Sequence, residues 1–128
     1  MILDTSAIIA ILFREAGSEE LREKALRAPA LGVGAPTLTE AGFLVTARRG
    51  GDAGAALLEF LDDLGVMTIP FGEAHWREAI EAFRRFGKGR HPAALNFGDC
   101  LSYATARVAG RPLLCVGDDF ARTDLPLA

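Results

Sequence analysis

Four short apolar runs, separated by stretches with helical periodicity, constrain the fold of this 128-residue chain more than any other feature. The stretch Glu73–Phe86 is typical, because Trp76, Ile80 and Phe83 fall on one helical face. Short buried strands that alternate with helices form a parallel sheet with helices on both sides. The sequence therefore predicts a single α/β domain over residues 1–128, with a short parallel sheet flanked by helices. The predicted strands are Met1–Leu3, Ala30–Gly34, Val66–Ile69 and Leu113–Val116, and the predicted helices are Ala7–Phe13, Ser18–Arg27, Thr37–Arg49, Ala53–Leu64, Glu73–Phe86 and Asn96–Ala109.

Composition and charge exclude several classes of protein. The longest apolar run, Ala7–Phe13, is far shorter than the ~20 residues that span a bilayer, and no basic segment followed by an apolar one indicates a leader. Cys100 and Cys115 have no metal-binding spacing, so we expect reduced structural thiols and a cytoplasmic protein without a membrane segment. The net charge of −3 gives no overall basic field, so any nucleic-acid binding needs a local basic rim.

Acidic residues stand at the ends of four predicted elements. Asp4 follows the first strand, Asp118-Asp119 follow the last strand, and Glu40 and Asp99 lie near the starts of helices. Right-handed crossovers bring the carboxyl ends of parallel strands to one edge of a sheet, where ligands bind in α/β proteins. The predicted architecture therefore allows four carboxylates to converge.

Each acid also has a structural explanation, which the sequence leaves open. Thr37-x-x-Glu40 matches a capping box, and Asp99 suits the positive end of a helix dipole. The pair Asp118-Asp119 suits a turn, as Gly117 precedes it. Asp4 suits an N-cap or an Asx-turn, and Thr5 or Ser6 could cap the following helix instead.

Taken together, the four acids favour a metal site. Carboxylates crowded into one cleft repel one another, and a hard divalent cation such as Mg²⁺ or Mn²⁺ relieves that repulsion. His75 and His91 stand alone in the sequence, so no histidine set indicates zinc. A carboxylate-only site without a Ser-His or Cys-His pair indicates metal-assisted hydrolysis of phosphate esters.

At these acids the sequence resembles PIN-domain ribonucleases, and more narrowly the VapC-type toxins of VapBC toxin–antitoxin systems. The motifs that carry the resemblance are Ile2-Leu3-Asp4-Thr5-Ser6-Ala7, Thr39-Glu40, Leu95-Asn96-Phe97-Gly98-Asp99-Cys100-Leu101-Ser102-Tyr103 and Gly117-Asp118-Asp119-Phe120-x-x-Thr123-Asp124. The resemblance implies a twisted sheet in a three-layer PIN-like fold and an endoribonuclease that depends on Mg²⁺ or Mn²⁺. It assigns catalytic and metal-binding roles to Asp4, Glu40, Asp99 and Asp119, with Asp118 as an alternative fourth acid and with Thr5 or Ser6 near the metal waters.

The predicted partners are RNA, an antitoxin and a second copy of the chain. The candidate RNA contacts are Lys88 and Arg90 in a glycine-containing loop, together with Arg48 and Arg49. The helices Ala7–Phe13 and Ala53–Leu64 carry more apolar surface than one small sheet covers, so we expect a homodimer. By resemblance, a VapB-type antitoxin binds an apolar groove and reaches the acidic cleft with a basic side chain.

Two alternatives compete with the ribonuclease interpretation. A PIN scaffold without catalytic activity could serve only to bind protein or RNA, although the four filled acidic positions disfavour it. A phosphoacceptor domain would need a second acid next to Asp4 and a lysine after a late strand, and no lysine follows Lys88.

Overall fold

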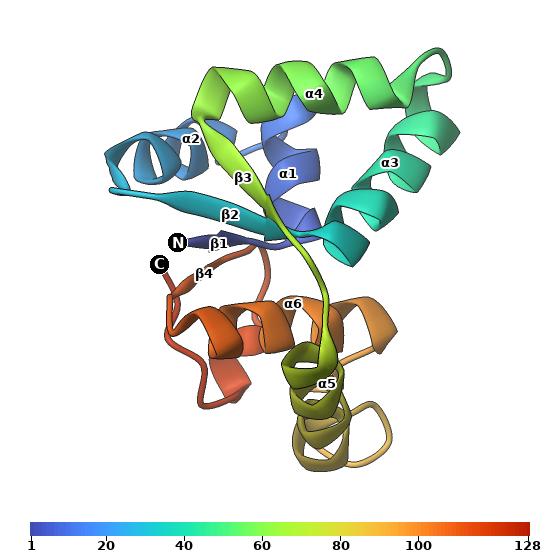
Figure 1. Cartoon of the computed structure of the whole chain (residues 1–128), viewed down its shortest axis with the longest axis vertical. Helices are drawn as coiled ribbons and strands as arrows, with labels where there is room; N and C mark the ends of the chain where they lie inside the picture. The colour runs from blue at the N-terminus through green and yellow to red at the C-terminus, as the bar shows by residue number, and fades with distance from the viewer.

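Four parallel strands form the centre of the molecule, in the order β3-β2-β1-β4 (Figure 1). This computed structural model describes residues 1–128. Neighbouring strands pair in register, with Ile2 opposite Gly32 on one side and opposite Leu113 on the other. The strands are β1 (Ile2–Leu3), β2 (Leu31–Gly34), β3 (Val66–Ile69) and β4 (Leu113–Leu114).

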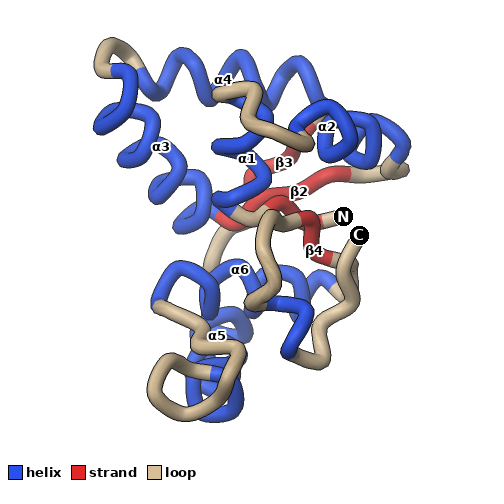
Figure 2. The backbone as a smooth tube through the Cα atoms, turned by 180° about the vertical axis from the view of Figure 1, so that it is seen from behind, coloured by secondary structure: helices blue, strands red, loops and turns tan.

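Helices cover both faces of the sheet and give the predicted three layers. In Figure 1 one layer lies above the sheet and contains α1 to α4, and the other lies below it and contains α5 and α6. The view from behind in Figure 2 shows the same division. No helix is long and apolar enough to cross a bilayer. The helices are α1 (Thr5–Leu12), α2 (Ser18–Arg27), α3 (Ala35–Arg49), α4 (Ala53–Leu64), α5 (Glu73–Phe86) and α6 (Phe97–Ala109), followed by the 3₁₀ helix η1 (Phe120–Arg122).

Alternating side chains of the strands supply two separate cores. Ile2 and Leu113 pack into the core on the α5–α6 side, whereas Leu3 and Leu114 pack into the core on the α1–α4 side. Successive residues of a strand point to opposite faces, so two-residue strands contribute one side chain to each layer. A strand with both faces covered has to be apolar throughout, which explains the short unbroken apolar runs of the sequence.

The order of the strands creates a crevice beside β1. From β1 the chain moves to β2 and then to β3, and it returns through α5 and α6 to place β4 on the opposite side of β1. Ligand sites of open α/β sheets lie at such a reversal, outside the carboxyl ends of the strands. Asp4 comes directly after β1, so it lies at this point.

Some element boundaries differ from the prediction. Helix α3 begins at Ala35 instead of Thr37, with Pro36 in its first turn, where a missing N–H breaks no helical hydrogen bond. Strand β4 ends at Leu114, two residues earlier than predicted. Helix α1 begins at Thr5 with Asp4 as its N-cap, so neither Thr5 nor Ser6 caps it.

The apolar surface also lies elsewhere than predicted. Helix α1 is largely buried within the domain, with Ile8 at 0% exposure, and α4 buries most of its leucines against the sheet. The exposed apolar side chains gather on α3, α5 and α6 instead. We call Phe43, Ile80, Phe83 and Phe97, which are 71%, 63%, 45% and 80% exposed, the apolar face.

Candidate active site

A cavity of about 330 Å³ opens at the crevice, and three of the predicted acids line it. We call this cavity the acidic pocket. Asp4 comes from the end of β1, Glu40 from α3 and Asp99 from the first turn of α6. The fold therefore brings together carboxylates that lie up to 95 positions apart in the chain, as the sequence predicted for this edge of the sheet (99 − 4 = 95).

The chain around Asp4 fixes its carboxylate. Asp4 is 5% exposed, and its Oδ2 accepts hydrogen bonds from the Ser6 backbone N–H at 3.0 Å and from the Ser6 hydroxyl at 2.6 Å. The same hydroxyl accepts a hydrogen bond at 2.9 Å from the backbone N–H of Val116, which follows β4. Ser6 thus links the end of β1 to the segment beyond β4 and holds one oxygen of Asp4 in place.

Glu40 is held by a neighbouring helix. Its carboxylate accepts a hydrogen bond from the hydroxyl of Thr5, which is buried. A Cβ atom at Gly98 would collide with the Glu40 carboxylate, so the glycine allows α6 to approach it. The capping-box explanation of Glu40 is wrong, because α3 has Gly34 as its N-cap and the hydroxyl of Thr37 faces that of Ser102 at 3.2 Å.

Asp99 takes part in the N-terminal capping box of its own helix, and its pKa is still raised. Its backbone N–H donates to Asn96 Oδ1 at 2.8 Å, and its Oδ2 accepts from the Asn96 N–H at 3.0 Å, so the two residues form a capping box. Burial raises the pKa of Asp99 to about 6, and the charges of Asp4, Asp119 and Glu40 act in the same direction. The capping hydrogen bond opposes these effects without cancelling them.

The doubled acid after β4 lies at the margin of this arrangement. Asp118 and Asp119 are both exposed, and neither lines the acidic pocket. Asp119 directly precedes η1, and its charge raises the pKa of Asp99. Asp118 has no such effect on Asp99. Of the pair, only the charge of Asp119 contributes to the raised pKa of Asp99.

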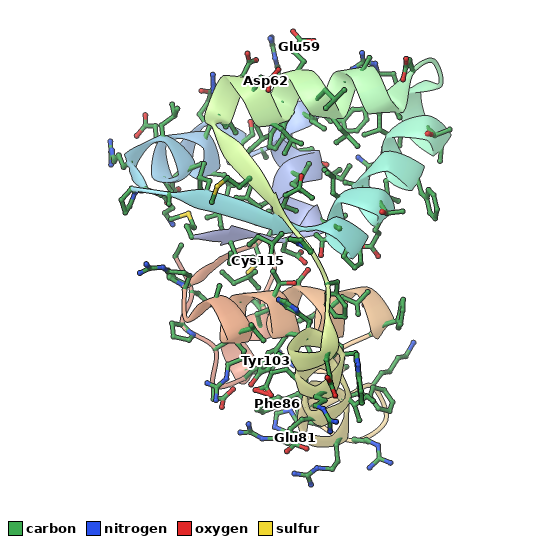
Figure 3. All side chains as sticks on the ribbon, in the orientation of Figure 1. Glu59, Asp62, Glu81, Phe86, Tyr103 and Cys115 are labelled. Atoms are coloured by element: carbon green, nitrogen blue, oxygen red, sulfur yellow. The ribbon has the colours of Figure 1, made fainter.

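The pKa of the Cys115 thiol also depends on these acids. Figure 3 places Cys115 below the sheet, near α6. Burial, together with the charges of Asp4, Asp99 and Asp119, raises the pKa of this thiol to about 11. Cys115 and Cys100 are both free, in agreement with the prediction of reduced thiols. The charges of Asp4 and Asp119 thus raise the pKa of both Asp99 and Cys115.

The donor set of the pocket fits a hard cation in chemistry and in charge. All the acidic groups offer oxygen ligands, and their mutual repulsion is what a bound divalent ion relieves. In their present rotamers the acids bond to their own helices and neighbours, and no three His, Cys, Asp or Glu side chains come close enough together to hold one ion. An ion held by three of these acids would require their side chains to move from the present positions.

The predicted RNA contacts separate into three locations. Arg48 lines the acidic pocket, whereas Arg49 lines a different groove between α1, α2 and α4. Lys88 and Arg90 lie in the loop after α5 and do not line the acidic pocket, and the guanidinium of Arg90 lies 5.7 Å from the centre of the Phe83 ring.

Sequence reasoning missed two polar residues of the pocket. Asn96 belongs to a recognisable Asn-x-x-Asp capping pattern, so a local signal for it was present. Glu15 lines the pocket from the turn after α1, and no pattern in the sequence links it to the acids.

The chain is similar to known proteins over nearly its whole length. The family model of the PIN domain matches residues 1–125. Ribonuclease VapC36 of Mycobacterium tuberculosis (strain ATCC 25618 / H37Rv) is 43% identical over 126 residues, which cover 98% of this chain and 91% of that protein. Ribonuclease VapC of Mycolicibacterium smegmatis is 38% identical over 125 residues, which cover 98% of this chain and 97% of that protein.

Solved structures show the same fold at lower identity. The crystal structure of VapC20 of Mycobacterium tuberculosis, a Sarcin-Ricin loop cleaving toxin, matches with a TM-score of 0.78 and 22% identity, covering 99% of this chain and 97% of that one. The structure of VapBC2 from Rickettsia felis, bound to a DNA fragment from its promoter, matches with a TM-score of 0.76 and 17% identity, covering 99% and 96%.

Proposed function

This chain belongs to the PIN-domain family and, within it, to the VapC ribonucleases, and on that basis we propose that it is the endoribonuclease toxin of a VapBC toxin–antitoxin pair. The acidic pocket is its proposed active site. The observation that carries this proposal is that Asp4, Glu40 and Asp99 line one cavity at the carboxyl end of β1. In agreement with it, burial and the charges of neighbouring acids raise the pKa of Asp99. Such uncompensated charge in a cavity is typical of functional sites.

We propose Mg²⁺ or Mn²⁺ as the cofactor, with Asp4 and Asp99 as principal ligands and with Glu40 and Asp119 completing the site. When bound, the ion lowers the pKa of a water molecule and neutralises charge that develops on the phosphate. The surrounding residues keep the carboxylates in place. Ser6 fixes one oxygen of Asp4, the Thr5 hydroxyl holds Glu40, and Asn96 fixes one oxygen of Asp99.

The test uses purified protein and a panel of structured and single-stranded RNAs. Cleavage should require Mg²⁺ or Mn²⁺, stop with EDTA and return when metal is restored. Asp99→Asn should abolish cleavage, because the amide keeps a capping oxygen but loses the charge that binds metal. Asp62→Asn is the matched control, since Asp62 is exposed on α4, away from the sheet (Figure 3). Cleavage by Asp99→Asn at the wild-type rate would refute the site.

We place the antitoxin in the groove between α1, α2 and α4, a cavity of about 580 Å³. Its apolar wall includes Leu12 and Phe60, and its rim carries both signs of charge, as a groove for a helix of another protein does. Arg14 lines this groove and the next residue, Glu15, lines the acidic pocket. A peptide leaving the groove at this turn therefore enters the pocket, where a basic side chain would neutralise the acids.

We place a homodimer contact on the apolar face. Two cavities meet there, because Phe97 and Leu101 line both. Large exposed apolar patches mark interfaces, and a patch that packs on itself gives a two-fold dimer. Glu40 lines one of these cavities as well as the acidic pocket, so dimerisation would bring two pockets near each other.

Light scattering after size exclusion tests the homodimer. Ile80→Glu should convert a dimer into a monomer, because it buries a charge in the contact. Leu58→Glu is the control, since Leu58 is 64% exposed on α4, away from the apolar face. A wild-type protein that is monomeric, or a dimer that survives Ile80→Glu, would refute this contact.

A further inference from the structure

Arg48 is the only cation that lines the acidic pocket. The other charged side chains of its wall are Asp4, Glu15, Glu40 and Asp99, all of them acidic. Arg48 lies on α3, eight positions after Glu40 (48 − 40 = 8), and its side chain is 50% exposed. Residues spaced in this way lie on the same side of a helix, so Arg48 stands at the mouth of the pocket above Glu40.

Two contacts from the end of α1 hold the guanidinium of Arg48. Its NH1 donates to Glu15 Oε1 at 3.2 Å, and its Cζ lies 5.2 Å from the centre of the Phe13 ring. The backbone at Arg14 has a positive φ of 50°, and the Glu15 N–H bonds to Ala10 O at 2.9 Å, so the chain folds back over α1. This turn is what places Glu15 beside Arg48.

The contacts leave most of the guanidinium free to bind. A guanidinium has five N–H donors in a planar fork, and Glu15 takes one of them. An exposed ion pair is weak because solvent screens it, so it fixes an orientation without locking the side chain. The contact with the Phe13 ring also restrains the orientation of the Arg48 guanidinium.

RNA needs such a group at this position. A phosphodiester approaching Asp4, Glu40 and Asp99 meets charge of its own sign, and a bound metal ion compensates only part of it. Resting on the proposed function, we propose that Arg48 binds an RNA phosphate at the mouth of the acidic pocket, oriented for it by Glu15 and Phe13. Arg49, the adjacent residue, lines the other groove and not the acidic pocket.

The test measures binding of a 5′-fluorescein-labelled 12-nucleotide single-stranded RNA by anisotropy. All variants carry Asp99→Asn, which prevents cleavage during the measurement. Arg48→Ala should weaken binding about 10-fold and lower the slope of log K against log salt by about one, as expected for one lost phosphate contact. Arg49→Ala removes the same charge one residue away and should change the affinity less than about 2-fold.

The variant Glu15→Gln tests whether Arg48 binds an RNA phosphate or only forms a structural ion pair with Glu15. The glutamine keeps an acceptor for Arg48 and removes a negative charge from the pocket, so RNA binding should become tighter. A structural ion pair predicts that Glu15→Gln and Arg48→Ala weaken binding together, and that outcome would overturn the proposal. So would equal affinities for Arg48→Ala and Arg49→Ala.

Cleavage by the protein without Asp99→Asn distinguishes the two proposals. If the wild-type chain cuts RNA with metal but Arg48→Ala cuts as well as Arg49→Ala, the role of Arg48 is refuted and the ribonuclease is retained. If the wild-type chain neither binds nor cuts any RNA, both proposals are refuted. Arg48→Ala should melt within a few degrees of the wild type, because it loses only an exposed pair.

Discussion

Two aspartates at α6, Asp99 in its first turn and Asp124 beside its Tyr103, show how this protein treats acids that serve different purposes. Burial and three neighbouring acids raise the pKa of Asp99 to about 6. At Asp124 the hydrogen bond from the Tyr103 hydroxyl lowers the pKa, and Arg85 lowers it further. The same side chain is thus left unneutralised at the acidic pocket and is fully partnered near the C-terminus.

The cluster at Asp124 is an anchor for the C-terminal segment. The Tyr103 hydroxyl donates to Asp124 Oδ1 at 2.6 Å, and Arg85 NH2 donates to Oδ2 at 3.1 Å, with Arg107 NH1 3.9 Å away. Tyr103 comes from α6 and Arg85 from α5, so one carboxylate ties the segment after η1 to both helices. Figure 3 shows Tyr103 in the lower helical layer, away from the sheet.

The partners of each carboxylate distinguish Asp124, a structural acid, from Asp99, a candidate catalytic acid. At the anchor, cations and a hydroxyl satisfy the carboxylate of Asp124. In the acidic pocket the one cation, Arg48, bonds to Glu15 and leaves the other acids uncompensated. An acid that only stabilises a fold gains from a partner, whereas an acid that binds metal has to keep its charge available.

The largest expected effect contrasts Asp4→Asn with Asp124→Asn in RNA cleavage. Asp4→Asn should slow single-turnover cleavage by about 1000-fold or more, because a metal ligand supplies several kcal/mol to the transition state. Asparagine is an equally good N-cap, so α1 should remain intact. Asp124→Asn should cut within about 2-fold of the wild type at a temperature well below its melting point. Equal rates for the two variants would remove the distinction between the two aspartates.

The second comparison is the stabilisation that a metal ion gives to the wild type, Asp99→Asn and Tyr103→Phe. Mn²⁺ at about 100 times its Kd should stabilise the wild-type protein by about 2.7 kcal/mol, since it binds only the folded state. Asp99→Asn should lose this shift in melting temperature, and Tyr103→Phe should retain it from a lower starting value. Differential scanning fluorimetry with and without EDTA measures both. A full shift in Asp99→Asn would contradict the assignment of Asp99 as a ligand.

Tyr103→Phe tests the anchor alone. The ring of Tyr103 is 2% exposed and phenylalanine fills the same space, so the variant loses only the hydrogen bond to Asp124. We expect a loss of about 1–2 kcal/mol in the free energy of unfolding, measured in urea. Arg84→Ala breaks the exposed pair with Glu81 and should cost clearly less than Tyr103→Phe, because solvent screens that pair. If Arg84→Ala cost as much as Tyr103→Phe, the anchor would be no more than another surface contact.

The smallest expected effect is the pH dependence of the anchor. The pKa of Asp124 is lower in the folded state than the ~3.9 of an unfolded aspartate, so its stabilisation is present above pH ~4 and is lost as the pH falls through the folded value. The side chain is 36% exposed, so solvent screening keeps this contribution below about 1 kcal/mol. The gap in unfolding free energy between the wild type and Asp124→Asn should shrink from pH 7 toward pH 3. A gap that widens in acid would contradict the lowered pKa.

Much of the fold could be predicted because its causes are local. Apolar runs indicated every strand, and periodicity, charge pairs and end signals indicated the six α-helices but not the short η1, since burial and backbone hydrogen bonding act over a few residues. The prediction failed at the start of α3, because Pro36 can end a strand or begin a helix. It also failed for the exposed apolar surface, because the periodicity of α1 does not reveal that neighbouring helices cover its other sides.

The sequence by itself determined the alternation of strands and helices, the positions of the acids at element ends and the membership of the family. Only the tertiary structure decided that Asp4, Glu40 and Asp99 share a pocket, that the charge of Asp119 raises the pKa of Asp99, and that Arg48 lines this pocket while Arg49 lines another groove. The physical reason is that the charge of a site sums over residues distant in the chain, whereas sequence patterns record neighbours. The crossover that sets β4 beside β1 creates the site.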